Sequence, residues 1–255
     1  IAGGVMAAYI AILGTSLAAA KGIDLSSAQV QIAVQLLAAS AMAAPASLVV
    51  AKLLHPETEE SMTKGNVKLK VEKNASNVIE AAANGASDGV ILAINVAAML
   101  ISFIALVALL NYFLTFLGDA TGLNPILIQN FNQPLSIQLL LGLILQFVGF
   151  AIGIPWQDAL HFGSLVGTKI VLNEFVAYLD LSKLISQNVL SQKTIVMASY
   201  ALCGFANFAS VAIQIGGIGA LAPSRKKDIS QFGLKAILGG TLATLMTATI
   251  GVMLL

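Results

Sequence analysis

Long stretches of this chain contain no charged residue, and this feature limits its fold more than any other. Residues 28–51 and 89–117 are uncharged throughout and mostly apolar. About 20 apolar residues in a helix, rising 1.5 Å each, cross the roughly 30 Å hydrocarbon core of a bilayer. Only 10% of the residues are charged and 58% are hydrophobic, whereas an average soluble chain has roughly 25% charged residues. The sequence therefore predicts an all-α polytopic membrane protein.

The basic residues indicate how the chain is oriented in the membrane. Nine of the thirteen Lys and Arg residues lie in or near two loops, 52–76 and 223–229. These nine are Lys52, Lys64, Lys68, Lys70, Lys73, Arg225, Lys226, Lys227 and Lys235. The intervening loop 118–134 has no Lys or Arg, so the positive-inside rule places it outside and both basic loops in the cytoplasm. This orientation holds only if residues 157–186 enter and leave the membrane on the same side.

The segment 157–186 is long enough to span a membrane but is unusually polar. It carries His161, Lys169, Asn173, Glu174 and Asp180. A helix with this content facing lipid would be costly. A re-entrant hairpin that is buried in protein, with the "NEF" stretch at its tip, avoids this cost.

Glu174 is the strongest candidate for a functional residue, because a carboxylate at membrane depth normally marks a pathway, a relay or a ligand contact. A carboxylate accepts hydrogen bonds from two adjacent hydroxyls, as a sugar diol would offer. The alternative is a structural ion pair with Lys169.

A second group of polar residues interrupts the apolar segment 194–222. Gly204 and its small neighbours would let the helix unwind, and Asn207 and Ser210 lie three residues apart. A discontinuous helix exposes free backbone N–H and C=O groups to a ligand. Phe205 could pack on a ring of that ligand. The alternative is that Asn207 and Ser210 only hold two helices together.

These residues carry a family resemblance. The stretches "LNEFVAYLDL", "GFANFASVAIQIGGIGALAP" and "NVIEAAANGASDGVILAINVAAMLI" resemble the concentrative nucleoside transporters. The resemblance extends over essentially the whole chain. It implies an inverted-repeat transporter with a re-entrant hairpin and discontinuous helices, assembled as a homotrimer in which a scaffold carries a mobile transport domain.

The resemblance also implies a division of the chain. Residues 1–54 would end the first inverted repeat, with a broken helix and the transmembrane helix after it, and 55–76 would be a cytoplasmic loop. Residues 77–134 would form a scaffold helix and an external loop, and 135–156 an external interfacial helix. Residues 157–255 would form the second repeat, with a hairpin, a broken helix and a final transmembrane helix.

Four site residues follow from the family's "NEF" and "FANFxS" motifs. In the family, the carboxylate, the Asn and the Ser of these motifs hold the ribose. The matching positions here are Glu174, Asn207 and Ser210, and Phe205 would line the site.

The part of the site that recognises the base is less complete in this sequence. Val5 matches an apolar position beside the base, and Ile1 lies close to a backbone ligand of sodium. The family's "GQTEAP"-like motif, which recognises the base and helps to bind sodium, is not found in this sequence and would lie before Ile1.

The implied function is cation-coupled import of nucleosides by alternating access, with sodium favoured over protons as the coupling ion. We expect no cofactor, no catalytic residue and no further metal site. The expected location is the plasma membrane, as a multi-pass protein of the bacterial inner membrane in contact with lipid. The basic residues form short loop clusters, so no nucleic-acid partner is expected.

Other functions remain open at this stage. The transporter could be proton-coupled. A membrane-embedded enzyme could use Glu174 as an acid or base, although no H-E-x-x-H or G-x-S-x-G motif accompanies it. A passive channel is a further possibility. A purely structural subunit would leave Glu174, Asn207 and Ser210 without a role.

Overall fold

The structure is a computed structural model that describes residues 3–58, 75–131, 133–221 and 223–253. Within these ranges the regular elements are all helices, which confirms the predicted all-α fold. In chain order they are α1 (Gly3–Lys21), α2 (Leu25–Leu54), α3 (Val78–Ala120), α4 (Leu123–Phe131), α5 (Ile137–Ala151), α6 (Trp156–Val171), α7 (Glu174–Ser186), α8 (Gln192–Leu202), α9 (Phe208–Leu221), the 3-10 turn η1 (Pro223–Arg225) and α10 (Lys226–Met253).

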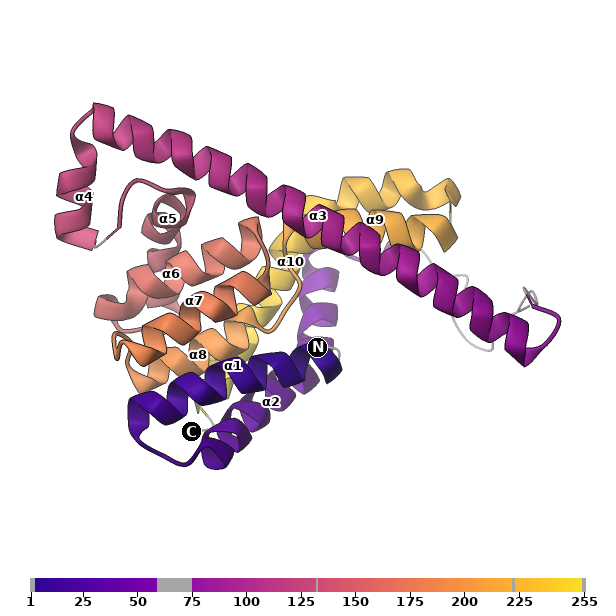
Figure 1. Cartoon of the computed structure of the whole chain (residues 1–255), viewed down its shortest axis with the longest axis horizontal. Helices are drawn as coiled ribbons and strands as arrows, with labels where there is room; N and C mark the ends of the chain where they lie inside the picture. Colours follow the sequence, from indigo (N-terminus) through magenta and orange to yellow (C-terminus); the bar gives the residue numbers. More distant parts are fainter. Residues whose placement is uncertain (1–2, 59–74, 132, 222, 254–255) are drawn as a thin grey trace.

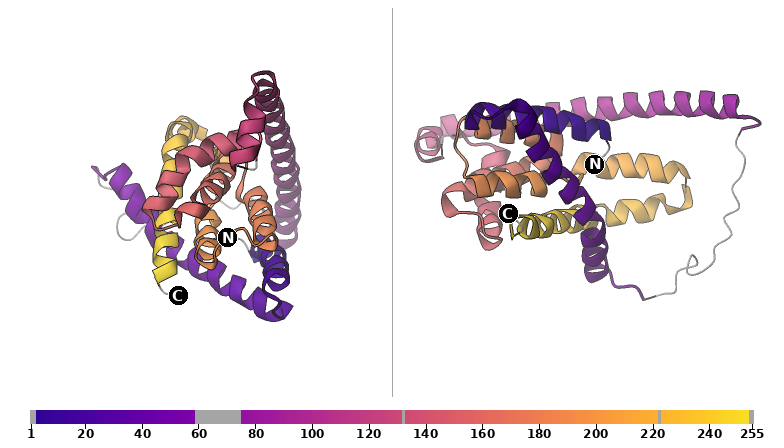
Figure 2. Two further views of the ribbon diagram at one scale, coloured as in Figure 1. Left: turned by 90° about the vertical axis from the view of Figure 1, so that its left-hand side faces the viewer. Right: turned by 90° about the horizontal axis from the view of Figure 1, so that it is seen from below.

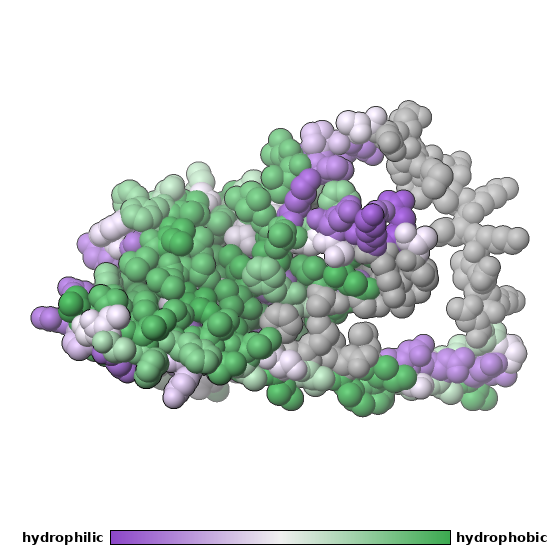
Figure 3. Space-filling view, turned by 90° about the horizontal axis from the view of Figure 1, so that it is seen from above, coloured by the Kyte–Doolittle hydropathy of each residue, from purple (hydrophilic) through white to green (hydrophobic). Residues whose placement is uncertain are grey.

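Several helices have the length and composition of membrane spans. Gly3–Lys21, Leu25–Leu54 and Lys227–Met253 each qualify alone among the described residues. Ile104–Ala120 and Leu123–Phe131 qualify together as a pair that is bent by 108°. Apolar side chains cover most of the face shown in Figure 3, and hydrophilic ones gather toward the ends of the molecule. Both observations agree with a polytopic membrane protein.

Polar caps define where the long helices begin. The carboxylate of Asp24 accepts hydrogen bonds from the backbone N–H groups of Ser26 and Ser27 at the start of α2, and the Ser26 hydroxyl lowers the pKa of Asp24. Asn77 accepts one from the Glu80 N–H, at 2.9 Å, at the start of α3. Such caps satisfy N–H groups that have no partner within the helix. Since α3 begins at Val78, residues 78–88, which precede the uncharged run 89–117, belong to the same helix as that run.

Helix α3 runs across one side of the molecule, and its N-terminal end extends beyond the other helices (Figure 1, Figure 2). It is followed by α4, in the segment where the sequence led us to expect only a loop. Asn124, which is 2% exposed, fixes this corner by donating to the Thr115 carbonyl oxygen at 2.9 Å and accepting from the Leu135 N–H at 2.9 Å.

The hairpin and the broken helix form as predicted. Helices α6 and α7 pack side by side and are joined by Leu172 and Asn173, and the Asn173 side chain caps α7 through the Val176 N–H at 2.9 Å. Helix α8 ends at Leu202 and α9 begins at Phe208, so the apolar segment is discontinuous. Helices α6, α7 and α8 lie together, with α1 packed on α7 (Figure 1). The hairpin is thereby placed against the break.

Glycines allow α5 and α6 to pack closely. A Cβ atom at Gly163 would lie 2.7 Å from the Gly142 carbonyl oxygen and 2.8 Å from the Gln146 nitrogen. Both are backbone atoms of α5, so a side chain at this position would push the two helices apart.

We therefore expect Gly163→Ala to destabilise the protein. Overpacking of this kind costs about 1–3 kcal/mol, which corresponds to a fall of about 4 °C in the thermal unfolding midpoint for a chain of this size. The measurement is thermal unfolding in detergent. Gly89→Ala is the control, because nothing lies within 4 Å of a Cβ at Gly89. Equal midpoints for the two variants would contradict the proposed close packing.

Candidate functional site

Glu174 lies at the tip of the hairpin as the first residue of α7, and only 6% of it is exposed. Its Oε1 atom accepts a hydrogen bond from the Tyr9 hydroxyl of α1 at 3.1 Å. Its Oε2 atom accepts one from Nδ2 of Asn207 at 3.1 Å. Three separate parts of the chain therefore meet at this carboxylate, and the expected proximity of Glu174 and Asn207 is present.

Asn207 joins the carboxylate to the start of α9. It is 1% exposed, and its Oδ1 atom accepts a hydrogen bond from the Ser210 N–H at 2.7 Å. This bond caps α9 and leaves the amide nitrogen facing Glu174. Helices α7 and α9 thus both begin beside the carboxylate, and helix N-termini carry partial positive charge. Discontinuous helices in transporters present their ends to ligands in this way.

A cavity of about 790 Å³ lies between α9 and α10 next to this pair. Phe205, Asn207, Ser210 and Gln214 are among the residues that line it. Phe205 is 48% exposed, so its ring is free to contact a ligand. Asn207 is in the cavity wall and Glu174 is not, so Asn207 connects the cavity with the buried carboxylate.

Tyr9 is a site residue that the sequence analysis missed. It is fully buried, and its ring packs on that of Tyr178 with centroids 4.3 Å apart. Tyr9 lies one helical turn after Val5, which is half-buried at the edge of the same core cluster. This spacing places both residues on one face of α1, so the prediction for Val5 could have led to Tyr9. Ile1 lies outside the described residues.

The ammonium group of Lys169 is bonded to groups other than the Glu174 carboxylate. It donates to the Ala201 carbonyl oxygen at 2.8 Å and to Oγ1 of Thr244 at 3.0 Å. The structural ion pair that we considered for Glu174 is therefore not formed, and the carboxylate is held by neutral donors.

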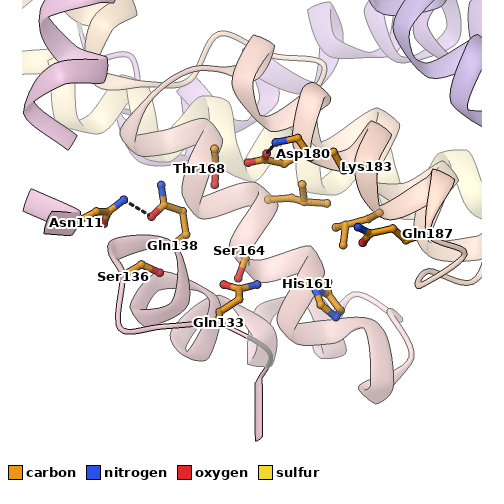
Figure 4. A pocket seen from close by; sticks show the side chains of 12 residues that line it. Asn111, Gln133, Ser136, Gln138, His161, Ser164, Thr168, Asp180, Lys183 and Gln187 are labelled. Atoms are coloured by element: carbon orange, nitrogen blue, oxygen red, sulfur yellow. Dashed lines mark hydrogen bonds and ion pairs between the residues drawn. The ribbon is translucent and has the colours of Figure 1, made fainter. Parts of the chain in front are cut away.

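A second cavity, of about 370 Å³, is lined by polar residues of α3, α5 and the hairpin (Figure 4). Nδ2 of Asn111 donates to Oε1 of Gln138 at 2.9 Å on one side of it. His161 and Ser164 line it from α6. None of the predicted ligand contacts is among its lining residues, so we treat it as a polar contact between the hairpin and its neighbours.

Discontinuous helices whose ends meet at a buried polar site are typical of secondary transporters with inverted repeats, and the break between α8 and α9 beside Glu174 has this form. The comparisons with known proteins agree with this class. Residues 35–251 match the model of the family described as "Na+ dependent nucleoside transporter C-terminus". This match covers most of the chain, and the protein belongs to that family, the concentrative nucleoside transporters.

Individual relatives support the same assignment. An uncharacterized transporter of Bacillus subtilis, YutK, is 49% identical over 84% of this chain and 51% of its own length. The nucleoside permease NupC of Helicobacter pylori is 42% identical over 84% of this chain and 49% of its own length. Human sodium/nucleoside cotransporter 1 is 38% identical over 97% of this chain and 36% of its own length. This is a family of transporters, and not of enzymes.

The fold is also that of a solved transporter. The structure of CNTnw in an inward-facing substrate-bound state superposes with a TM-score of 0.73 at 38% identity. The match covers 99% of this chain and 53% of that one. The chain thus spans about half the length of the bacterial relatives that it matches.

Proposed function

We propose that this chain provides the ribose-binding part of a cation-coupled nucleoside symporter that works by alternating access. The observation that supports this proposal most strongly is the buried pair of Glu174 and Asn207, which joins the hairpin tip to the broken helix. The family and the named activities of its members supply the substrate class. Transport needs no bond to be made or broken, only binding energies that differ between the two facing states.

The chemistry of the pair suits a ribose. Each oxygen of Glu174 accepts one hydrogen bond from the protein and keeps capacity for another. Two neighbouring hydroxyls of a sugar can donate to these oxygens. In the proposal Ser210 adds a polar contact and Phe205 packs on the ligand's rings.

The base and the cation are proposed to bind in a different part of the site from the ribose. Val5 would contact the base from α1, and Ile1 would lie near the cation. The coupling ion is proposed to be sodium. The matching family is described as Na+ dependent, and the human relative is named a sodium/nucleoside cotransporter. A proton-coupled symporter is the alternative.

The proposed setting follows from the same family. The symporter would be a homotrimer in the bacterial inner membrane. The scaffold would come from residues 77–134, with 135–156 as the external interfacial helix. The two repeats, represented here by residues 1–54 and 157–255, would move together.

An uptake experiment tests the ribose contact. In proteoliposomes that contain the whole symporter and have an inward sodium gradient, we expect uridine to accumulate and 2',3'-dideoxyuridine to compete about 100-fold less well than unlabelled uridine. A hydrogen bond to a charged group contributes about 1.5–3 kcal/mol, and buried acceptors left without a donor cause strong discrimination. 5'-Deoxyuridine, which keeps both ring hydroxyls, is the control and should compete well.

Two results would count against the proposal. Equal competition by uridine and the dideoxynucleoside would mean that the site does not bind the ribose hydroxyls. Accumulation driven by a proton gradient without sodium would favour the proton-coupled alternative.

A further inference from the structure

Lys169 is a buried cation that the proposed ribose contact does not use. It lies in the last turn of α6, and its exposed fraction is 0%. A charge that is fully removed from water costs several kcal/mol unless it is well bonded. The partners of this ammonium group must therefore stabilise it in place of water.

The Ala201 carbonyl that accepts from Lys169 belongs to the last turn of α8. The last four carbonyls of a helix have no partner within it. Here the oxygen of Ser199 accepts from the Tyr178 hydroxyl, that of Tyr200 from the Cys203 N–H, and that of Leu202 from the Gly204 N–H. Among these four, the Ala201 oxygen is the one bonded to a charged group.

The second partner of the ammonium group completes a small cation-binding pocket. The Thr244 hydroxyl of α10 donates to the Thr241 carbonyl oxygen at 3.0 Å, so its oxygen is left to face Lys169. The carboxyl end of a helix carries partial negative charge. In discontinuous helices such ends, with nearby carbonyl oxygens, bind coupling cations.

We propose that Lys169 is a tethered cation, whose ammonium group occupies the place that a small monovalent cation would take at the end of α8. It would thereby hold the hairpin tip against the helix break. Glu174 follows Lys169 across the turn at Leu172 and Asn173 that joins α6 to α7. Asn207 lies just after the break, so this tether keeps Glu174 and Asn207 at hydrogen-bonding distance. The role of this tether in ribose binding rests on the proposed function. The proposal that a cation binds at the end of α8 does not depend on that function.

The test removes the amine and supplies a free cation. Lys169→Ala leaves room in the pocket, and we expect sodium or methylammonium chloride to raise its thermal unfolding midpoint relative to N-methyl-D-glucamine chloride at equal ionic strength. The rise should exceed that of the unmodified protein by about 3 °C or more, since ligand binding to the folded state is stabilising. Lys169→Met fills the same space without charge and should show no extra rise.

The remaining outcomes also decide the question. The proposal would be overturned if sodium or methylammonium raised the unfolding midpoint of Lys169→Ala no more than that of the unmodified protein. It would also be overturned if these cations raised the midpoint of Lys169→Met as much as that of Lys169→Ala. If the alanine variant aggregates in every buffer, Lys169→Gln decides, because it keeps a neutral donor. If the unfolding midpoint of Lys169→Gln lies several degrees below that of the unmodified protein, a charged group is needed at this position, as proposed. An equal midpoint would overturn the proposal. These measurements use no nucleoside, so they stand even if the proposed substrate is wrong.

Discussion

Replacing Glu174 by glutamine is expected to abolish concentrative nucleoside uptake. The two groups that bind this side chain, the Tyr9 hydroxyl and the Asn207 amide nitrogen, are both donors. A carboxylate accepts from both, whereas a carboxamide turns its own NH₂ group toward one of them. The variant thus loses the charge and one acceptor at once, and we expect uridine affinity to fall about 100-fold.

The measurement is sodium-driven uridine uptake, together with equilibrium binding to purified protein. Asp180→Asn is the matched control, because Asp180 lies on the same helix but its side chain is 38% exposed and pairs with Lys183 at 3.0 Å. Its removal should leave uptake unchanged. Wild-type affinity in Glu174→Gln, or equal losses in both variants, would argue that the carboxylate does not contact the ribose.

Much of the fold could be predicted because the bilayer restricts the choices of the chain. Uncharged runs indicated the spans, and the cost of Glu174 and Lys169 in lipid indicated a buried hairpin. The boundaries of α3 and the presence of α4 were harder to predict. They depend on the Asn77 cap and on the contacts of Asn124 with Thr115 and Leu135, and apolar periodicity does not report such local bonds.

The candidate site was only partly accessible from the sequence. Glu174 and Asn207 stood out because polar residues are rare in apolar segments, and the structure brings them together. Tyr9 did not stand out, because an aromatic residue in an apolar helix is ordinary and its bond to Glu174 joins positions 165 residues apart. The bond between Lys169 and Ala201 could not be predicted from the sequence either, because it depends on how the hairpin packs against α8.

The opposite end of the hairpin is tied to α8 by a second buried charge. Oδ2 of Asp158, in the first turn of α6, accepts from the Ser191 N–H at 3.0 Å, the Ser191 hydroxyl at 2.6 Å and the Thr194 hydroxyl at 2.6 Å. Asp158 is 6% exposed and Thr194 is fully buried. With Lys169 at the other end, both ends of α6 are thus bonded to α8, and the hairpin and the first half of the broken helix are expected to move as one body.

Asp158→Ala should therefore cause the largest loss of stability among the variants proposed. It removes the shared acceptor of three donors, of which the Thr194 hydroxyl is fully buried and the two of Ser191 belong to an exposed residue. At a cost of about 3 kcal/mol, we expect the thermal unfolding midpoint to fall by about 8 °C. Asp24→Ala is a close control: one oxygen of Asp24 also accepts from two backbone N–H groups and a serine hydroxyl, but in an exposed position. Water can replace its bonds, so its midpoint should fall much less. Equal shifts would mean that Asp158 only caps a helix and does not hold the hairpin to α8.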